Sequence, residues 1–170
     1  SLGVGEPDFP TPEHVREAAI ASIKKGDTKY TDNRGTVELR AAAADYLTKF
    51  DLHYDKQDEI LITMGASEGI DLALRTLVNP GEEVLVAEPS YVSYIPCIEL
   101  CGGVPVSLKL RAENKFRLTR EQLEEKITEK SKVLLISYPN NPTGAIMEKE
   151  DLEAIAEVVK EHDLFVITDE

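Results

Sequence analysis

Short apolar runs alternate with amphipathic segments along most of this chain, and this alternation restricts the possible folds more than any other feature. The runs have the length of buried strands, and the segments between them carry apolar residues at helical spacing, with Gly or Pro near their ends. Strand–helix alternation of this kind favours a mainly parallel sheet covered by helices on both faces. The sequence therefore predicts an α/β fold.

The predicted elements can be placed by residue number. Strands are expected at residues 59–64, 83–87, 104–110, 132–137 and 164–168. Helices are expected at residues 13–25, 36–50, 70–78, 120–128 and 149–161, and another opens at residues 88–91 and stops at Gly102-Gly103. Residues 1–12 read as a strand or an extended arm that enters a loop.

One loop is the first candidate for a ligand site. The apolar run before Ser137 breaks into Tyr-Pro-Asn-Asn-Pro-Thr-Gly, which ends at Gly144. In open α/β folds, ligands bind where strands end at the carboxyl edge of the sheet. Asp169 follows another apolar run and is expected at the same edge. Prolines, asparagines and glycine are also ordinary turn chemistry, so the loop alone is equally consistent with a plain connection.

A second candidate site is the turn formed by Gly65, Ala66 and Ser67. A glycine turn between a strand and a helix exposes backbone N–H groups at the positive end of the helix, where they can bind phosphate. Neither Gly-x-Gly-x-x-Gly nor a P-loop is present, which argues against the usual nucleotide sites. Without a ligand, the same pattern is simply a helix start.

Composition excludes several functional classes. The 170 residues have a formal net charge of -13, which opposes non-specific binding to nucleic acid. No apolar run approaches the roughly 20 residues that a membrane span requires. Cys97 and Cys101 are expected as buried, reduced thiols of a cytoplasmic protein. We predict no metal site, because the three histidines are scattered: His14, His53 and His162.

Six motifs, in order along the whole chain, resemble the markers of one enzyme family. Asn141-Pro142-Thr143-Gly144 is similar to the signature of the class I and II pyridoxal-phosphate-dependent aminotransferases of fold type I. The other five are Gly3-Val4-Gly5-Glu6-Pro7-Asp8-Phe9, Tyr30 with Gly35, Gly65-Ala66-Ser67, Pro89-Ser90-Tyr91 and Thr168-Asp169-Glu170. The resemblance implies transfer of an amino group between an amino acid and a 2-oxo acid.

The resemblance also implies roles for single residues. Gly65, Ala66 and Ser67 would hold the phosphate of pyridoxal 5'-phosphate, and the ring of Tyr91 would lie against the pyridine. Asn141 would donate to the phenolate oxygen and contact the substrate. Asp169 would pair with the ring nitrogen, and an ionised carboxylate there favours the protonated ring.

Two further roles concern the substrate and a partner subunit. The backbone of Gly5 would contact the substrate carboxylate, because glycine allows close approach. Tyr30 would reach the cofactor phosphate of a second subunit, so the resemblance implies a homodimer. The expected domains are residues 1–27, an N-terminal arm and helix, and residues 28–170, an incomplete cofactor-binding large domain.

The family's Schiff-base lysine is expected beyond Glu170, so we expect this chain to be the N-terminal portion of a longer protein and inactive alone. Two alternatives to an aminotransferase stay open. A carbon–sulfur β-lyase shares nearly all of the motifs, and a non-catalytic ligand-binding module could retain the fold. The sequence does not specify which amino acid is the substrate.

Overall fold

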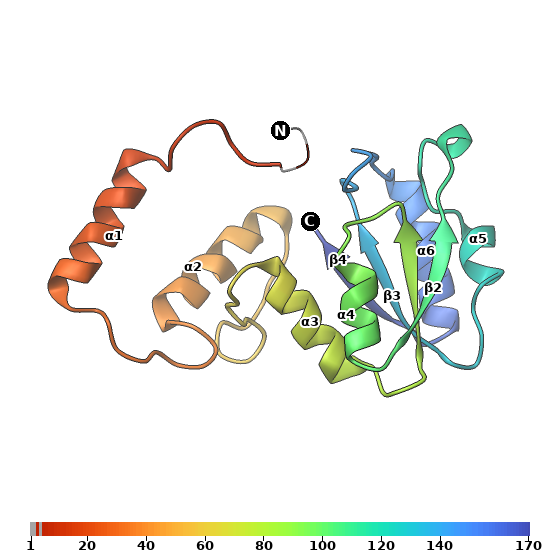
Figure 1. Cartoon of the computed structure of the whole chain (residues 1–170), viewed down its shortest axis with the longest axis horizontal. Helices are drawn as coiled ribbons and strands as arrows, with labels where there is room; N and C mark the ends of the chain where they lie inside the picture. The colour runs from red at the N-terminus through yellow and green to blue at the C-terminus, as the bar shows by residue number, and fades with distance from the viewer. Residues whose placement is uncertain (1–2, 4) are drawn as a thin grey trace. The chain divides into compact units, whose positions relative to one another are not determined.

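The computed structural model describes residue 3 and residues 5–170, and its chain divides into two compact units. The units are Ser1–Ile62 and Thr63–Glu170, and each is described by itself. Figure 1 labels their helices and strands along the chain. Part of the predicted N-terminal arm, at residues 1, 2 and 4, lies outside the described residues.

The second unit is built around a parallel sheet of four strands in the order β2-β1-β3-β4. The strands are β1 (Glu83–Glu88), β2 (Val104–Lys109), β3 (Ser131–Ser137) and β4 (Phe165–Asp169). All three neighbouring pairs are parallel, and the register aligns Ser137 with Asp169. The predicted α/β class with a parallel sheet is therefore confirmed.

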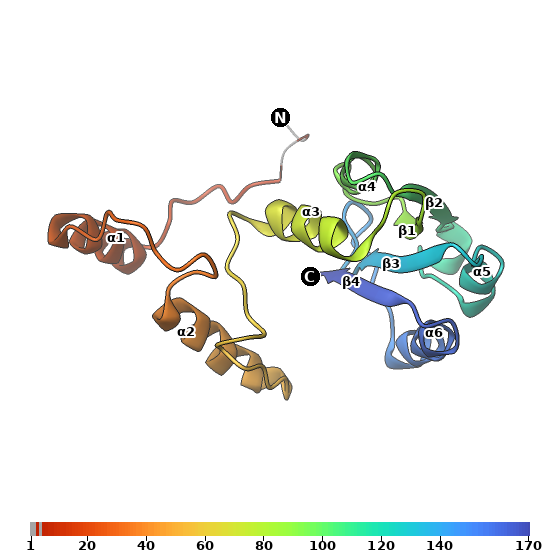
Figure 2. The ribbon, with the colours of Figure 1, turned by 90° about the horizontal axis from the view of Figure 1, so that it is seen from below.

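Helices cover both faces of this sheet, as Figure 2 shows from below. One face packs on α3 (Ala66–Leu77) and α4 (Tyr94–Leu100), and the other on α5 (Arg120–Glu124) and α6 (Lys149–Glu161). Alternate residues of a strand point to opposite faces. Accordingly, Val84 of β1 packs with α3 and α4, whereas its neighbour Leu85 packs with α5 and α6.

The first unit contains α1 (Glu13–Lys25), α2 (Val37–Leu47) and a short 3-10 turn, η1 (Thr48–Phe50). Helix α1 ends, as predicted, at Gly26, whose left-handed backbone (φ 89°) suits glycine. Helix α2 begins after Thr36, whose side chain accepts a hydrogen bond from the backbone of Leu39. Among the described residues of this unit, only Arg40 is buried.

One predicted strand is wrong. Residues 59–64 form no strand, because no described strand lies beside them to complete a hydrogen-bonded ladder. The backbone N–H of Ile62 instead donates to the carbonyl of Arg34 at 3.0 Å. The apolar pattern is that of a strand, but pairing depends on a partner that the local sequence does not specify.

Four predicted helices differ from the observed ones at their ends. The helix predicted over residues 36–50 is α2, which ends at Leu47 and is followed by the 3-10 turn η1. Helix α3 begins earlier, at Ala66, and includes Ser67 in its first turn. Helix α4 begins later, at Tyr94, because residues 91–94 form a turn in which Tyr94 N–H donates to the carbonyl of Tyr91 at 3.2 Å. Helix α5 keeps the predicted capping box of Thr119 and Gln122 but ends at Glu124.

Candidate active site

The polar residues of the second unit gather where β1, β3 and β4 end. Parallel strands finish at the same edge of a sheet, and here they end at Glu88, Ser137 and Asp169. The loops that follow β1 and β3 are joined there, since the Asn140 amide donates to the carbonyl of Pro89 at 3.1 Å. This carboxyl edge is where an open α/β sheet binds its ligand.

The carboxylate of Asp169 is held by a tyrosine from another element. The hydroxyl of Tyr94, on α4, donates to Oδ2 of Asp169 at 2.6 Å. Tyr94 is only 1 % exposed, whereas Asp169 is half-buried. Burial, followed by the hydrogen bond to Asp169, raises the pKa of Tyr94 to about 12, so its phenol remains a donor at neutral pH.

Tyr91 links this carboxylate to the start of helix α3. Its ring meets the ring of Tyr94 edge to face, with the ring centroids 5.7 Å apart. Hydrogen bonding to the side chains of Ser93 and Ser67 lowers the pKa of the Tyr91 phenol, and the charge of Asp169 opposes that shift. Tyr91 therefore lies near both Ser67 and Asp169.

The start of α3 has the geometry of an anion site. Gly65 precedes the helix with φ 86° and ψ 164°, a backbone conformation that side-chain-bearing residues rarely adopt. The following Ala66 and Ser67 are exposed, and the first N–H groups of a helix have no partner within it. The carboxylate of Glu68 turns away to accept from the backbone N–H of Met64. The helix end thus presents free donors.

The two asparagines of the loop after β3 have different environments. Asn140 is 4 % exposed, and its Oδ1 accepts from the backbone N–H and the hydroxyl of Thr143, at 3.2 and 2.7 Å. Asn141 is exposed, and its side-chain amide has no hydrogen-bond partner among the residues that the structure describes. Asn140 shapes the loop, whereas Asn141 is available to a ligand.

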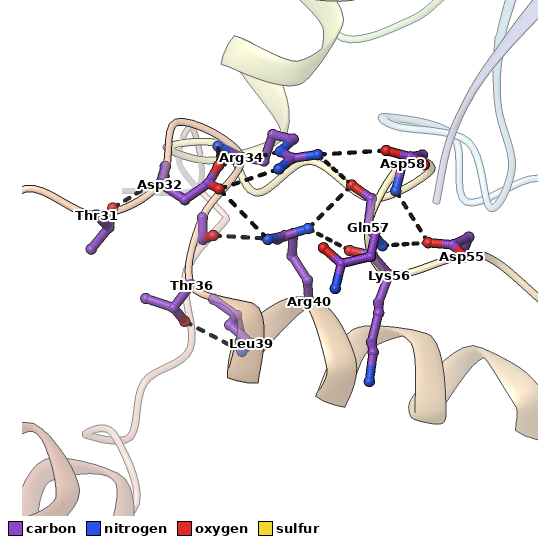
Figure 3. Close-up of polar contacts among 11 residues, drawn as sticks. Thr31, Asp32, Arg34, Thr36, Leu39, Arg40, Asp55, Lys56, Gln57 and Asp58 are labelled. Carbon is purple, nitrogen blue, oxygen red and sulfur yellow. Dashed lines mark hydrogen bonds and ion pairs between the residues drawn. The ribbon is translucent and has the colours of Figure 1, made fainter.

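The other two predicted site residues, Gly5 and Tyr30, belong to the first unit. Both are exposed, and Tyr30 reaches 107 % relative exposure. The loop that follows Tyr30 is held by the polar network of Figure 3. In that network Arg34 pairs with Asp32 at 3.3 Å and donates to the carbonyl of Gln57 at 2.7 Å.

Arg40 is the buried centre of the same network. Its guanidinium donates to the carbonyls of Gly35, Lys56 and Gln57 at 3.3, 2.5 and 3.2 Å. Gly35 itself has φ +92°, and a Cβ there would lie 2.6 Å from the side chain of Ile62. Glycine is therefore required at this position both by backbone conformation and by space.

Two residues that matter at the edge of the sheet were not predicted as site residues. Asn140 was read only as part of a turn, and its burial has no local signal. Tyr94 was expected to pack in the core; it is buried, and it also binds Asp169. Tyr94 and Asp169 are 75 residues apart in sequence, so spacing could not reveal their contact.

The histidines and cysteines were considered as possible metal ligands. Within residue 3 and residues 5–170, His, Cys, Asp and Glu form no group of three that could bind a metal ion. Cys97 and Cys101 are free and half-buried, and burial raises the pKa of the Cys97 thiol. In this part of the chain, no helix is long and apolar enough to span a bilayer.

Known proteins match the chain along its full length. The family model "Aminotransferase class I and II" matches residues 1–170. The chain is 46 % identical to aromatic-amino-acid aminotransferase 2 of Thermococcus litoralis and 45 % identical to aspartate aminotransferase of Pyrococcus abyssi. Each alignment covers 100 % of this chain and 44 % of the relative, so the chain spans less than half the length of these relatives.

A solved structure shows the same fold. The crystal structure of an aromatic aminotransferase from Pyrococcus horikoshii OT3 superposes with a TM-score of 0.96 at 44 % identity. The superposition covers 99 % of this chain and 45 % of that protein. The sheet with its two helical layers is thus part of the fold-type I aminotransferase architecture. By sequence and by structure, the chain belongs to the class I and II aminotransferase family.

Proposed function

We propose that this chain is the N-terminal part of a pyridoxal-5'-phosphate-dependent aminotransferase, which moves an amino group between an amino acid and a 2-oxo acid. When bound, the cofactor supplies an electron sink for chemistry at the substrate's α-carbon. The observation that carries the proposal is that Tyr91 packs against the cluster of α3 and against Tyr94, whose hydroxyl donates to Asp169, in a member of this family. The start of α3 suits the cofactor's phosphate, the ring of Tyr91 suits the flat face of its pyridine, and the carboxylate of Asp169 suits its ring nitrogen.

Each residue at the edge of the sheet has a proposed task. The backbone N–H groups of Ala66 and Ser67, with the Ser67 hydroxyl, bind the phosphate beside Gly65. The ring of Tyr91 packs against the pyridine face. Asp169 holds a proton on the ring nitrogen through a charge-assisted hydrogen bond. The free amide of Asn141 donates to the phenolate oxygen and contacts the substrate.

The first unit and the oligomer belong to the same proposal. Gly5 binds the substrate carboxylate through its backbone, and Tyr30 binds the cofactor phosphate of a second subunit in a homodimer. The high exposure of Tyr30 is compatible with a role outside its own subunit. We further propose that residues 1–27 form the arm and first helix, that residues 28–170 belong to the cofactor-binding domain, and that the enzyme is cytoplasmic.

The test uses the protein expressed from its complete coding sequence. We expect it to bind pyridoxal phosphate with a visible absorbance band that borohydride abolishes, and to transfer amino groups to 2-oxo acids. Asp169→Asn should lower kcat by at least about a hundredfold, because it removes the charge at the ring nitrogen. The control is Glu170→Gln, which neutralises the adjacent exposed carboxylate and should leave kcat within about twofold.

Other outcomes would redirect or refute the proposal. A colourless protein that cannot be reconstituted with the cofactor would refute it. Release of pyruvate and a thiol from a sulfur amino acid, without amino transfer, would assign the protein to the carbon–sulfur β-lyases. The chain alone, without the rest of the protein, is expected to show no amino transfer.

A further inference from the structure

The strongest feature that the proposed roles leave unused is the hydroxyl of Tyr94. It makes the one hydrogen bond that the Asp169 side chain has among the described residues, at 2.6 Å to Oδ2. A tyrosine that only filled the core would need no hydroxyl, and a buried hydroxyl is costly unless it is paired. The pairing therefore indicates a role for the hydroxyl itself.

The hydrogen bond from Tyr94 leaves the second oxygen of the Asp169 carboxylate, Oδ1, available. A carboxylate has two oxygens that can each accept hydrogen bonds. Oδ2 of Asp169 is occupied by Tyr94, whereas Oδ1 has no partner among residues 3 and 5–170. Asp169 is the last residue of β4, which pairs with one strand, β3, among the described residues, and Asp169 lies there opposite Ser137. The bond to a rigid, buried phenol thus fixes the side chain's direction.

The phenol is itself held in place. Its ring packs in the apolar cluster of α3, α4, β1 and β3, and it meets the Tyr91 ring edge to face. The side chain of Ser137, at the end of β3, partly offsets the rise in the pKa of the phenol. The Tyr94 hydroxyl thus reaches Asp169 from a ring that its packing holds in place under the carboxyl edge.

We propose that Tyr94 is a positioning residue, whose phenol holds the Asp169 carboxylate so that its second oxygen meets the cofactor's ring nitrogen. This inference rests on the proposed function, because it assumes that Asp169 binds that nitrogen. It adds a residue that acts through Asp169 and does not itself touch the cofactor. A purely structural tyrosine at this position would be replaceable by phenylalanine without consequence for the cofactor.

The test measures cofactor affinity in the complete protein. Pyridoxal phosphate is titrated into the cofactor-free protein, and the visible absorbance gives the Kd. Tyr94→Phe keeps the ring and removes the hydroxyl, so we expect about tenfold weaker binding and a shifted absorbance band. The matched control is Tyr138→Phe, whose hydroxyl bonds the backbone of Leu118 and Phe116 on the opposite face of the sheet. Its Kd should stay within about twofold of the wild type.

A double-mutant cycle separates positioning from packing. In an Asp169→Asn background, Tyr94→Phe should weaken binding by less than about twofold, because the group that it positions is already altered. Two results would overturn the inference while leaving the proposed function intact. One is that Tyr94→Phe binds the cofactor with the same Kd as the wild type. The other is that Tyr94→Phe weakens binding by the same factor in the wild-type and Asp169→Asn proteins. A wild-type protein that binds no cofactor would overturn the proposed function and this inference together.

A second measurement does not depend on the folding of Tyr94→Phe. In the cofactor-free wild-type protein, the Tyr94 hydroxyl proton should exchange slowly and give a far-downfield proton signal, because it is buried and shared with a carboxylate. We expect that signal to disappear in Asp169→Ala, which removes the acceptor. Its persistence in Asp169→Ala, or its absence from the wild type, would contradict the proposed contact.

Discussion

The two units of the chain are stabilised by opposite means. In Thr63–Glu170, two apolar clusters fill the faces of the sheet, and the central strand residues Val84, Leu85 and Leu134 are 0 % exposed. In Ser1–Ile62, the one buried side chain among the described residues is a charged one, Arg40. The second unit has the interior of a folded domain, and the first is held chiefly by hydrogen bonds to loop carbonyls.

The difference bears on where each unit obtains its stability. Apolar burial contributes about 25 cal/mol per Å², whereas a single hydrogen bond contributes only about 1 kcal/mol net. The first unit leaves many large apolar side chains exposed: Phe9, Val15, Ile20, Ile23, Val37, Leu39, Tyr46, Phe50, Leu52, Tyr54 and Leu61. We therefore expect the second unit to respond most to changes in packing, and the first to changes in charge and hydrogen bonding.

The largest expected effect is a cavity in the second unit. Leu85→Ala removes a fully buried side chain between β1 and the α5–α6 layer and should lower the free energy of unfolding by about 3 kcal/mol. Urea unfolding of the complete protein measures this loss of stability, and hydrogen exchange at the amides of β1 and β3 shows whether it lies in the sheet. Leu100→Ala, at a side chain that is 70 % exposed, is the control and should cost less than about 0.5 kcal/mol. If Leu85→Ala and Leu100→Ala lowered the free energy of unfolding equally, the side chain of Leu85 would not lie in a packed core.

A smaller effect is expected when the buried charge of the first unit is removed. Arg40→Met leaves the carbonyls of Gly35 and Lys56 without their donor, whereas that of Gln57 keeps Arg34, and the change should destabilise the unit by about 2 kcal/mol. Faster hydrogen exchange at Gln57 and Asp58, whose amides bond to Asp55, reports the loosened loop. Arg34→Met removes a half-exposed guanidinium and should destabilise the unit clearly less than Arg40→Met does. If both variants behaved alike, burial of Arg40 would not be what holds the loops.

The same contrast explains what could be predicted from the sequence. Strand and helix periodicity is a local property, so β1, β3 and α6 were located to within a residue or so. Residues 59–64 have strand composition but no partner to pair with, and pairing is a non-local property. In the first unit, nothing in the local pattern marks Arg40 as buried, because charged residues are almost never fully buried unless paired.

The candidate site follows the same rule. Asp169 and Asn141 were found because they end or follow apolar runs that are strands, β4 and β3, in the structure. The turn at Gly65 was found as a glycine before a helix, and that helix, α3, is present although the strand predicted before it is not. Their proposed roles came from the family resemblance and stay predictions. The hydrogen bond from Tyr94 to Asp169 joins α4 to β4 across 75 residues, and only the folded sheet brings the two together.

The smallest expected effect concerns the charge of Asp32 in the first unit. Hydrogen bonds from the Arg34 side chain and backbone lower the pKa of Asp32 below its ordinary value of 3.8. Because the folded-state pKa is lowered, this pair stabilises the unit above pH 3.8, and the contribution is lost as the pH falls through the lowered pKa. An NMR titration of the Asp32 carboxyl carbon should give a midpoint below 3.8, and Arg34→Gln should raise it. Lys25→Gln, which removes the partner of Asp27, is the control and should leave the Asp32 midpoint unchanged. If Arg34→Gln left the midpoint of the Asp32 titration unchanged, the exposed pair of Arg34 and Asp32 in Figure 3 would contribute nothing to the network. Arg40 alone would then hold the loops.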